Sequence, residues 1–237
     1  MTSSLHNAWN DHTLSPAINK NIWPICISIS QKHAWSKTPL RQGSEPFHQL
    51  HLDLMRNSFC FGITIATNYS AYLFIVTTPG KLTGWKGLPT ESTASIITAL
   101  KSWLTQAELL GQTKSVHFIR TDARSAFTSA KFIAACNDLG IKLEAAAPEH
   151  QEMNGICEAK WRKVHNTANI LLNTALLGGA FFQYAHAYAI HIVKSCPAKN
   201  VTVQDGNPTT PFQYSNNSKP SLANFHVFGC PVFFKRY

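Results

Sequence analysis

The sequence predicts an α/β protein with a mixed five-stranded sheet, three antiparallel strands followed by parallel ones, flanked by helices. Short apolar segments come first, and from about residue 90 they alternate with longer segments whose apolar residues recur at helical spacing. The resulting order, β-β-β-α-β-α-β-α, favours a meander followed by strands that are joined through helices. We divide the chain into a weakly patterned lead-in (1–47), a core (48–178) and a helical extension with a tail (179–237).

The first strand is expected around Asp53, where apolar residues flank a single acid. Segments 59–66 and 72–76 are rich in β-branched and aromatic residues and predict two further strands. The short stretch Asn68-Tyr69-Ser70 would join them as a turn. Segment 79–89 contains glycine and proline and is expected to form a loop.

Helices and strands then alternate. Segment 96–107 has one apolar face, with Thr90 or Ser92 as a possible cap and Gly111 as a possible end. The later elements are a strand over 116–122, a helix from a Thr128 or Ser129 cap to Gly140, a strand over 141–145, and a helix over roughly 180–194 after Gly178-Gly179.

Between the last strand and the Gly178-Gly179 break, another helix carries a core-facing seam, with spacings of 3 and 4 residues, that runs from Cys157 to Ala175. A polar stripe lies beside this seam: Glu158, Arg162, His165 and Asn169. One interpretation of Glu158 is therefore a helix-start acid that pairs with Arg162 and is favoured by the helix dipole.

Composition limits the function classes. The chain has 21 Lys and Arg against 12 Asp and Glu, a net charge of +9, which favours a polyanionic partner. Its six cysteines form no Cys-x-x-Cys pair and indicate reduced thiols in the cytoplasm or nucleus. The first twenty residues lack an apolar signal core, and the longest apolar stretch, 180–193, is too short and polar for a bilayer span.

Three carboxylates stand out in a chain with so few acids. Asp122 closes the strand over 116–122, Glu158 begins a helix after 35 intervening residues, and Asp53 lies in the first strand. Carboxylates gathered at strand ends and a helix start can hold two Mg²⁺ ions. Such a site suits chemistry at phosphodiesters.

Several motifs around these acids resemble, in order, those of the integrase core of copia-type LTR retrotransposons, part of the retroviral integrase and RNase H-like superfamily. The resemblance covers about four-fifths of the chain, from His48 to Phe234. The matching segments are His51-Leu52-Asp53, Asn68-Tyr69-Ser70, Arg120-Thr121-Asp122 with Phe127, Pro148 with Asn154-Gly155-Ile156-Cys157-Glu158, Cys196-Pro197, Asn207-Pro208-Thr209-Thr210-Pro211, Lys219-Pro220-Ser221-Leu222 and Val227-Phe228-Gly229-Cys230.

The resemblance implies an enzyme that trims DNA ends and joins them to target DNA, with Asp53, Asp122 and Glu158 binding two Mg²⁺ or Mn²⁺ ions. It also implies a homo-oligomer acting on element ends and target DNA, or on RNA, in the nucleus and cytoplasm and not at a membrane. Basic residues that follow Glu158 are candidate DNA contacts: Lys160, Arg162 and Lys163.

The sequence departs from this family beside the acids. The family's Asn-Gly-x-Glu after the second acid is here Ala123-Arg124-Ser125-Ala126, and Ala159 replaces an arginine. In the lead-in, His6, His12 and Cys26 resemble only three ligands of the family's zinc module, so no zinc is expected. The chain ends soon after Cys230, which suggests a fragment of a longer polyprotein.

Three hypotheses remain open from the sequence. The first is an active, metal-dependent integrase core. The second is a decayed or domesticated copy that binds nucleic acid without catalysis, favoured by the altered residues after Asp122. The third is an RNase H-like nuclease, which the copia-like tail from Asn207 to Cys230 disfavours.

Overall fold

The computed structural model describes residues 47–56, 69–109, 116–122, 124–145, 155–198, 201, 208–223 and 225–231. All of them belong to one of the two units into which the chain divides, Pro39–Tyr237. The predicted strand over 59–66 and the three residues of the zinc-module remnant, His6, His12 and Cys26, lie outside the described residues.

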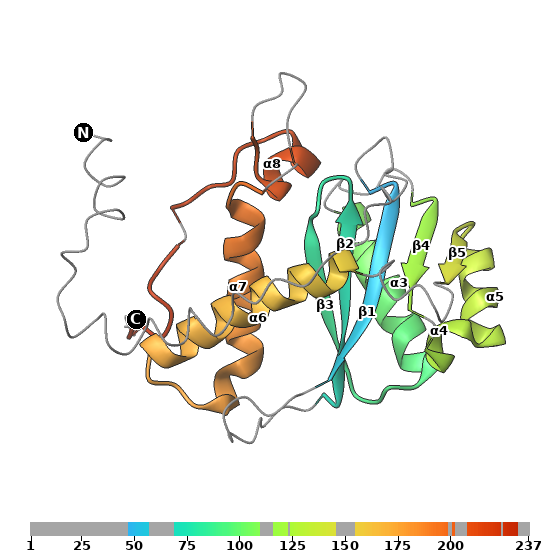
Figure 1. Ribbon diagram of the computed structural model, residues 1–237, viewed down its shortest axis with the longest axis horizontal. Helices are drawn as coiled ribbons and strands as arrows, with labels where there is room; N and C mark the ends of the chain where they lie inside the picture. Colours follow the sequence, from blue (N-terminus) through green and yellow to red (C-terminus); the bar gives the residue numbers. More distant parts are fainter. Residues whose placement is uncertain are drawn as a thin grey trace, which may run out of the picture. The chain divides into compact units, whose positions relative to one another are not determined.

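One five-stranded sheet forms the centre of this unit (Figure 1). Its strands are β1 (Gln49–Arg56), β2 (Ala71–Thr78), β3 (Thr83–Leu88), β4 (Phe118–Thr121) and β5 (Lys142–Ala145). They lie in the order β3-β2-β1-β4-β5. β1 pairs antiparallel with β2, and β2 with β3, whereas β4 is parallel to both β1 and β5. The predicted fold class, antiparallel at first and parallel later, is confirmed.

The loop predicted over 79–89 is wrong, because it contains strand β3. Gly84 and Gly87 lie in this strand, and glycine there suggested a loop. The structure gives both a packing reason: a Cβ at Gly84 would overlap the indole of Trp103, and one at Gly87 would overlap the ring of Tyr69. A strand glycine commonly marks such a close approach to the backbone.

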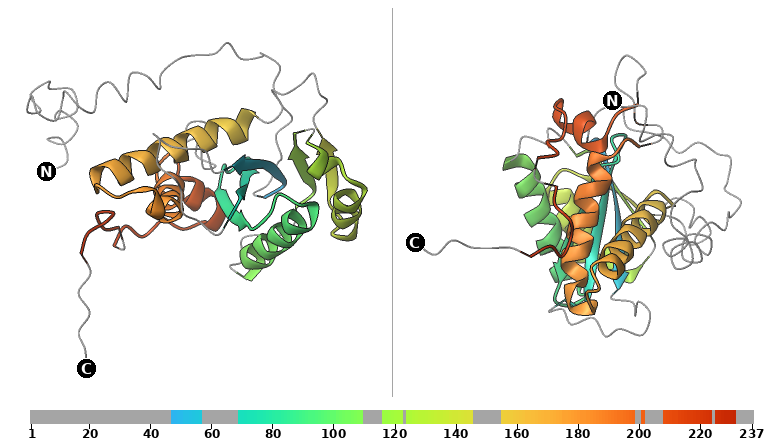
Figure 2. Two further views of the ribbon diagram at one scale, coloured as in Figure 1. Left: turned by 90° about the horizontal axis from the view of Figure 1, so that it is seen from below. Right: turned by 90° about the vertical axis from the view of Figure 1, so that its left-hand side faces the viewer.

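Helices cover both faces of the sheet, as Figure 2 shows from two further directions. α3 (Thr93–Leu109), the short α4 (Ser125–Thr128) and α5 (Ala130–Asp138) pack on one face, and α6 (Gly155–Thr174) and α7 (Phe182–Ser195) on the other. A 3₁₀ turn, Gly179–Phe181, precedes α7, and α8 (Pro211–Asn216) was not expected. No helix among the described residues is long and apolar enough to cross a membrane.

Serine side chains cap the starts of α3 and α5, as predicted for Ser92 and Ser129. Ser92 Oγ accepts a hydrogen bond from the amide of Ser95 at 3.3 Å, and Ser129 Oγ accepts one from Phe132 at 3.3 Å. Each bond satisfies a backbone N–H that has no partner inside the helix. The second cap also fixes the direction of the chain that follows strand β4.

A buried pair of histidines holds α6 against α7. His186 is fully buried, and its Nδ1 lies 3.0 Å from the carbonyl oxygen of Phe182, so Nδ1 carries the proton. Its Nε2 therefore accepts from Nδ1 of His165 at 3.1 Å. Burial lowers the pKa of His186 to about 3, which keeps the ring neutral. The pair thereby fixes the helix whose first turn carries Glu158.

Candidate active site

Asp53 in β1 and Asp122 directly after β4 come level when the parallel register of the two strands is continued by two residues. In the β1–β4 register Gln49 faces Phe118, an offset of 69 residues, and Asp53 to Asp122 is the same offset (122 − 53 = 69). Asp53 lies in the buried part of β1, whereas Asp122 directly follows β4 and is more exposed. The topology thus brings together two acids that are far apart in the sequence.

Both acids also lie on the same face of the sheet. Leu52, Leu54 and Ile119 belong to the core under α3 and α5. Side chains alternate along a strand, so the residues between them, Asp53 among these, point to the α6 side. The same alternation directs Arg120 and Asp122 there.

Glu158 joins this face from the first turn of α6, where its side chain is exposed. Cys157 and Val164, on the buried side of α6, pack with Phe74 and Val76 of β2. Among the described residues, Glu158 forms no ion pair with Arg162, so the expected pairing within the helix is not observed. An acid in a helix's first turn is still favoured by the helix dipole.

The charges of Asp122 and Glu158 both act on Asp53. Burial raises the pKa of Asp53 to about 6, Arg124 opposes the rise, and the charges of Asp122 and Glu158 add to it. Such effects require Asp122 and Glu158 to lie near Asp53. The site therefore concentrates negative charge at one end of β1 and β4.

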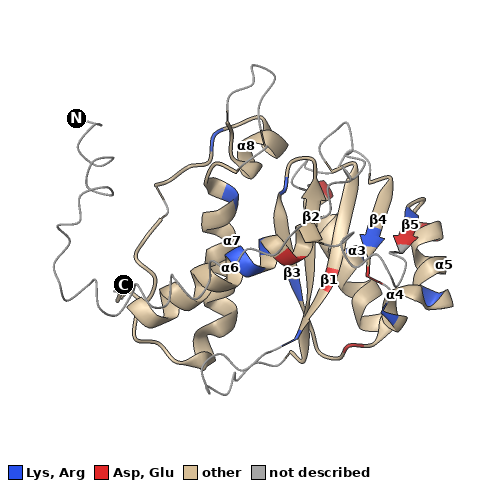
Figure 3. Cartoon of the chain, viewed as in Figure 1, with Lys and Arg blue, Asp and Glu red and all other residues tan. Residues whose placement is uncertain are grey.

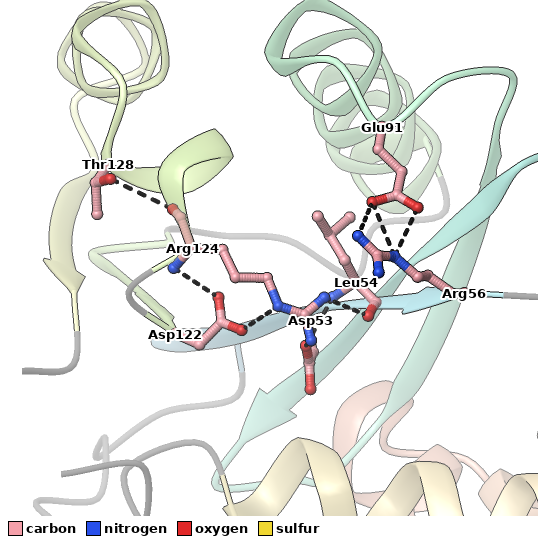
Figure 4. A network of polar contacts seen from close by, with 7 residues as sticks. All are labelled: Asp53, Leu54, Arg56, Glu91, Asp122, Arg124 and Thr128. Atoms are coloured by element: carbon pink, nitrogen blue, oxygen red, sulfur yellow. Dashed lines mark hydrogen bonds and ion pairs between the residues drawn. The ribbon is translucent and has the colours of Figure 1, made fainter. Parts of the chain in front are cut away.

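Arg124 lies among these acids (Figure 4). Its Nε is 2.7 Å from Oδ2 of Asp122, its Nη1 donates to the carbonyl oxygen of Leu54 at 2.8 Å, and its Nη2 is 3.9 Å from Oδ1 of Asp53. The backbone amide of Arg124 also donates to Oδ1 of Asp122 at 3.3 Å. One guanidinium thus bridges the acids of β1 and β4.

The donor set is chemically suited to Mg²⁺ or Mn²⁺, which prefer carboxylate oxygens. Within the described ranges, however, no three His, Cys, Asp or Glu side chains are arranged to hold one metal ion. Arg124 supplies a cation between Asp53 and Asp122. The carboxylates are thus the right kind of ligand for a divalent cation, but a guanidinium already lies between two of them.

The three basic residues of α6 all lie in the half nearer its start, beyond Glu158 (Figure 3). Arg162 and Lys163 are exposed, but Lys160 is buried. Burial, with smaller contributions from Lys163 and Lys81, lowers the pKa of Lys160 to about 8. The three residues were predicted together as DNA contacts, but only two of them are exposed to solvent.

A polar network continues along the same face of β1. His51 Nε2 lies 3.3 Å from the hydroxyl of Thr78, and Arg120 pairs with Glu144 at 2.8 Å. Burial, helped by the charge of Arg120, lowers the pKa of His51 to about 4. This face is therefore polar beyond the acids themselves.

Arg124 is the residue that the sequence reasoning missed as part of the site. It was noted only as a departure from the family pattern. An arginine two residues after a candidate metal-binding acid could have indicated this role, because at that spacing its side chain can form an ion pair with the acid.

No model of a known protein family matches the chain. Single proteins do match it. The chain is 28% identical over 94 residues to the retrovirus-related Pol polyprotein from transposon RE1 of Arabidopsis thaliana. It is 25% identical over 115 residues to the retrovirus-related Pol polyprotein from transposon TNT 1-94 of Nicotiana tabacum. The matches cover 40% and 48% of this chain but only 6% and 8% of the two relatives. The chain thus spans less than a tenth of either polyprotein.

Solved structures with a similar fold include retroviral integrases. The catalytic core domain of BIV integrase superposes with a TM-score of 0.50 over 72% of this chain and 95% of its own (14% identity). The HTLV-2 core, solved with magnesium in a trimeric form, gives 0.50 over 73% and 99% (20% identity). A chain of a simian T-cell lymphotropic virus intasome bound to PP2A regulatory subunit B56 gamma gives 0.58 over 86% and 66% (18% identity).

These likenesses agree with the order and direction of the strands in the sheet. The resemblance expected from the sequence motifs is confirmed at the level of fold and kinship. Part of the chain is thus similar to the retrovirus-related Pol polyproteins of two plant transposons, and its core has the fold of a retroviral integrase catalytic core.

Proposed function

We propose that the chain is the integrase catalytic core of a retrotransposon polyprotein, which trims the ends of the element's DNA and joins them to target DNA. The observation that carries this proposal is the same-face position of Asp53 in β1 and Asp122 at the end of the neighbouring β4, with the Glu158 charge near Asp53. The fold supports it, because the solved neighbours are integrase cores. Phosphodiester chemistry needs negative side chains gathered at one point to hold a cation.

In this proposal the carboxylates of Asp53, Asp122 and Glu158 hold Mg²⁺ or Mn²⁺. A cation held there would supply Lewis acidity for attack on the phosphodiester. The short hydrogen bond from the Leu54 amide to Oδ1 of Asp53, 2.8 Å, orients that carboxylate. Orientation of the ligands by neighbouring groups is typical of working metal sites.

DNA is the proposed partner, and a homo-oligomer the proposed assembly. Arg162 and Lys163 are exposed beyond Glu158 on α6, where they could hold backbone phosphates. Lys160 could join them only if the DNA reaches its partly enclosed side chain. One structural neighbour belongs to an intasome, and another was solved as a trimer.

A DNA-joining assay tests the proposal. The full chain is mixed with labelled DNA ends, target DNA, and Mg²⁺ or Mn²⁺, and both end trimming and joined products are measured. We expect Asp53→Asn and Glu158→Gln each to lower joining by at least ~10³-fold, because each removes a ligand charge at the reacting phosphate. Asp138→Asn, an exposed acid at the end of α5, is the matched control and should retain activity.

Three other results would count against this function. DNA binding by the unmodified chain without any joining, across Mg²⁺ and Mn²⁺ concentrations, would support the non-catalytic alternative. Joining that survives both Asp53→Asn and Glu158→Gln would show that the chemistry lies elsewhere. Cleavage of RNA–DNA hybrids without joining would instead indicate a nuclease.

A further inference from the structure

Arg124 occupies a position that its backbone and side chain both fix. It is the N-cap residue of α4, and its carbonyl oxygen accepts hydrogen bonds from the amides of Phe127 at 3.0 Å and Thr128 at 3.2 Å. Its own amide donates to Asp122. The Cα of Arg124 is therefore tied to the start of α4 and to one of the acids.

The guanidinium group is held from two strands. Nε contacts Asp122 after β4, and Nη1 contacts the carbonyl of Leu54 in β1. A planar guanidinium with several donors in a fixed fork is suited to such a bridge, and it stays charged at any physiological pH. This side chain is about half exposed (46%), so solvent can reach it but does not separate it from the acids.

The contacts of Arg124 divide the carboxylate oxygens into two sets. Both oxygens of Asp122 bond to Arg124, one to its side chain and one to its amide. Oδ1 of Asp53 faces the guanidinium and the Leu54 amide. Among the described residues, Oδ2 of Asp53 and the carboxylate of Glu158 have no hydrogen bond or ion pair, so Arg124 does not engage them.

Charge leads to the same division. A guanidinium is a cation, so the position between Asp53 and Asp122 already holds a positive charge. A second divalent ion between Asp53 and Asp122 would have to displace the guanidinium from its two close contacts or lie against it. Like charges at such short range repel strongly where water is partly excluded.

We propose that Arg124 is a resident cation of the site, which occupies the position between Asp53 and Asp122 and excludes a divalent ion from it, so that the chain binds one divalent ion instead of two. This inference rests on the proposed function, since it takes the three acids as a metal site. It differs from the two ions expected from the sequence. It also explains how the chain keeps its three acids although an arginine stands between two of them.

The test counts Mn²⁺ ions bound per full-length chain by calorimetry and by electron paramagnetic resonance of free and bound Mn²⁺. We expect one ion for the unmodified chain and two for Arg124→Gln, which is neutral and close in size. Arg124→Lys keeps the charge and should remain at one. Arg162→Gln, an exposed cation one turn from Glu158, is the matched control for a general loss of positive charge and should also remain at one.

A second readout needs no variant. Two Mn²⁺ ions ~3.5–4 Å apart, as in two-metal sites, are magnetically coupled and change the resonance spectrum. We expect the saturated, unmodified chain to give the spectrum of an isolated ion. Thermal unfolding of each variant without metal checks that it folds.

The outcomes separate the two proposals. Two coupled ions in the unmodified chain, or a second ion in Arg162→Gln as well, would overturn the role of Arg124 while leaving a metal-dependent integrase intact. One ion in both the unmodified chain and Arg124→Gln would do the same. No bound ion in any form would overturn the metal site itself, and with it both proposals.

Discussion

On one face of strands β1 and β4 lie Leu50, Leu52 and Ile119, fully buried against α3 and α5. On the other face the alternate residues include His51, Asp53 and Arg120, which are almost as buried but polar or charged. The backbone is the same for both faces, so the difference comes only from the side-chain period of two. One face supplies apolar burial for stability, and the other holds charged groups that favour the fold less.

Shortening Leu52 should give the largest loss of stability. Leu52→Ala removes a fully buried side chain from the apolar face and leaves a cavity, so we expect the free energy of unfolding to fall by about 2–5 kcal/mol. Urea unfolding followed by circular dichroism measures it. A loss below about 1 kcal/mol would mean that this face is not the main core.

Replacing the next residue along β1, Asp53, with a neutral one should instead increase the free energy of unfolding. Its folded-state pKa of about 6 lies above the ordinary 3.8, so its favourable contribution is complete below pH ~4 and is lost as the pH rises through about 6. Asp53→Asn cannot ionise and avoids that loss of stability. At pH 7 we expect its free energy of unfolding to exceed that of the unmodified chain by an amount on the order of 2–3 kcal/mol.

Unfolding free energies of both forms from pH 4 to pH 7.5 test this prediction. Their difference should grow between pH 4 and 6 and then level off. A difference that does not change with pH would mean that the Asp53 carboxylate is not strained by burial. The comparison of the two forms cancels the titration of the buried histidines, which both share.

The apolar face also requires glycine at one position of β3. Gly84→Ala would press a methyl group against the indole of Trp103, and overpacking of this kind costs about 1–3 kcal/mol. Gly178→Ala is the control, because nothing lies within 4 Å of its Cβ position. Equal stability of the two variants, measured by thermal unfolding, would contradict the packing that we describe.

The smallest effect is expected at the start of α5, on the apolar side. Ser129→Ala removes the oxygen that accepts from the Phe132 amide, and loss of a cap costs about 0.5–2 kcal/mol. Ser125→Ala in α4, an exposed serine, is the control. A loss confined to Ser129→Ala would confirm that the cap, and not the serine content of this segment, stabilises α5.

Much of the fold could be predicted from the sequence, because local periodicity determines it. The apolar faces of α3 and α6, the caps Ser92 and Ser129, and the switch from antiparallel to parallel strands follow from spacing and connection length. Strand β3 could not be predicted, because its glycines indicate a loop. Only the structure shows that the rings of Trp103 and Tyr69 lie against these glycines.

The sequence by itself determined the three acids, the strands that carry two of them and the family that they resemble, since each depends on residue identity and order. Only the tertiary structure decided what lies between the acids. Arg124 bridges Asp53 and Asp122 because β1 and β4 pair with a register that puts the two acids level, although 68 residues separate them. A contact across two strands depends on that register, which no local pattern near residue 124 encodes.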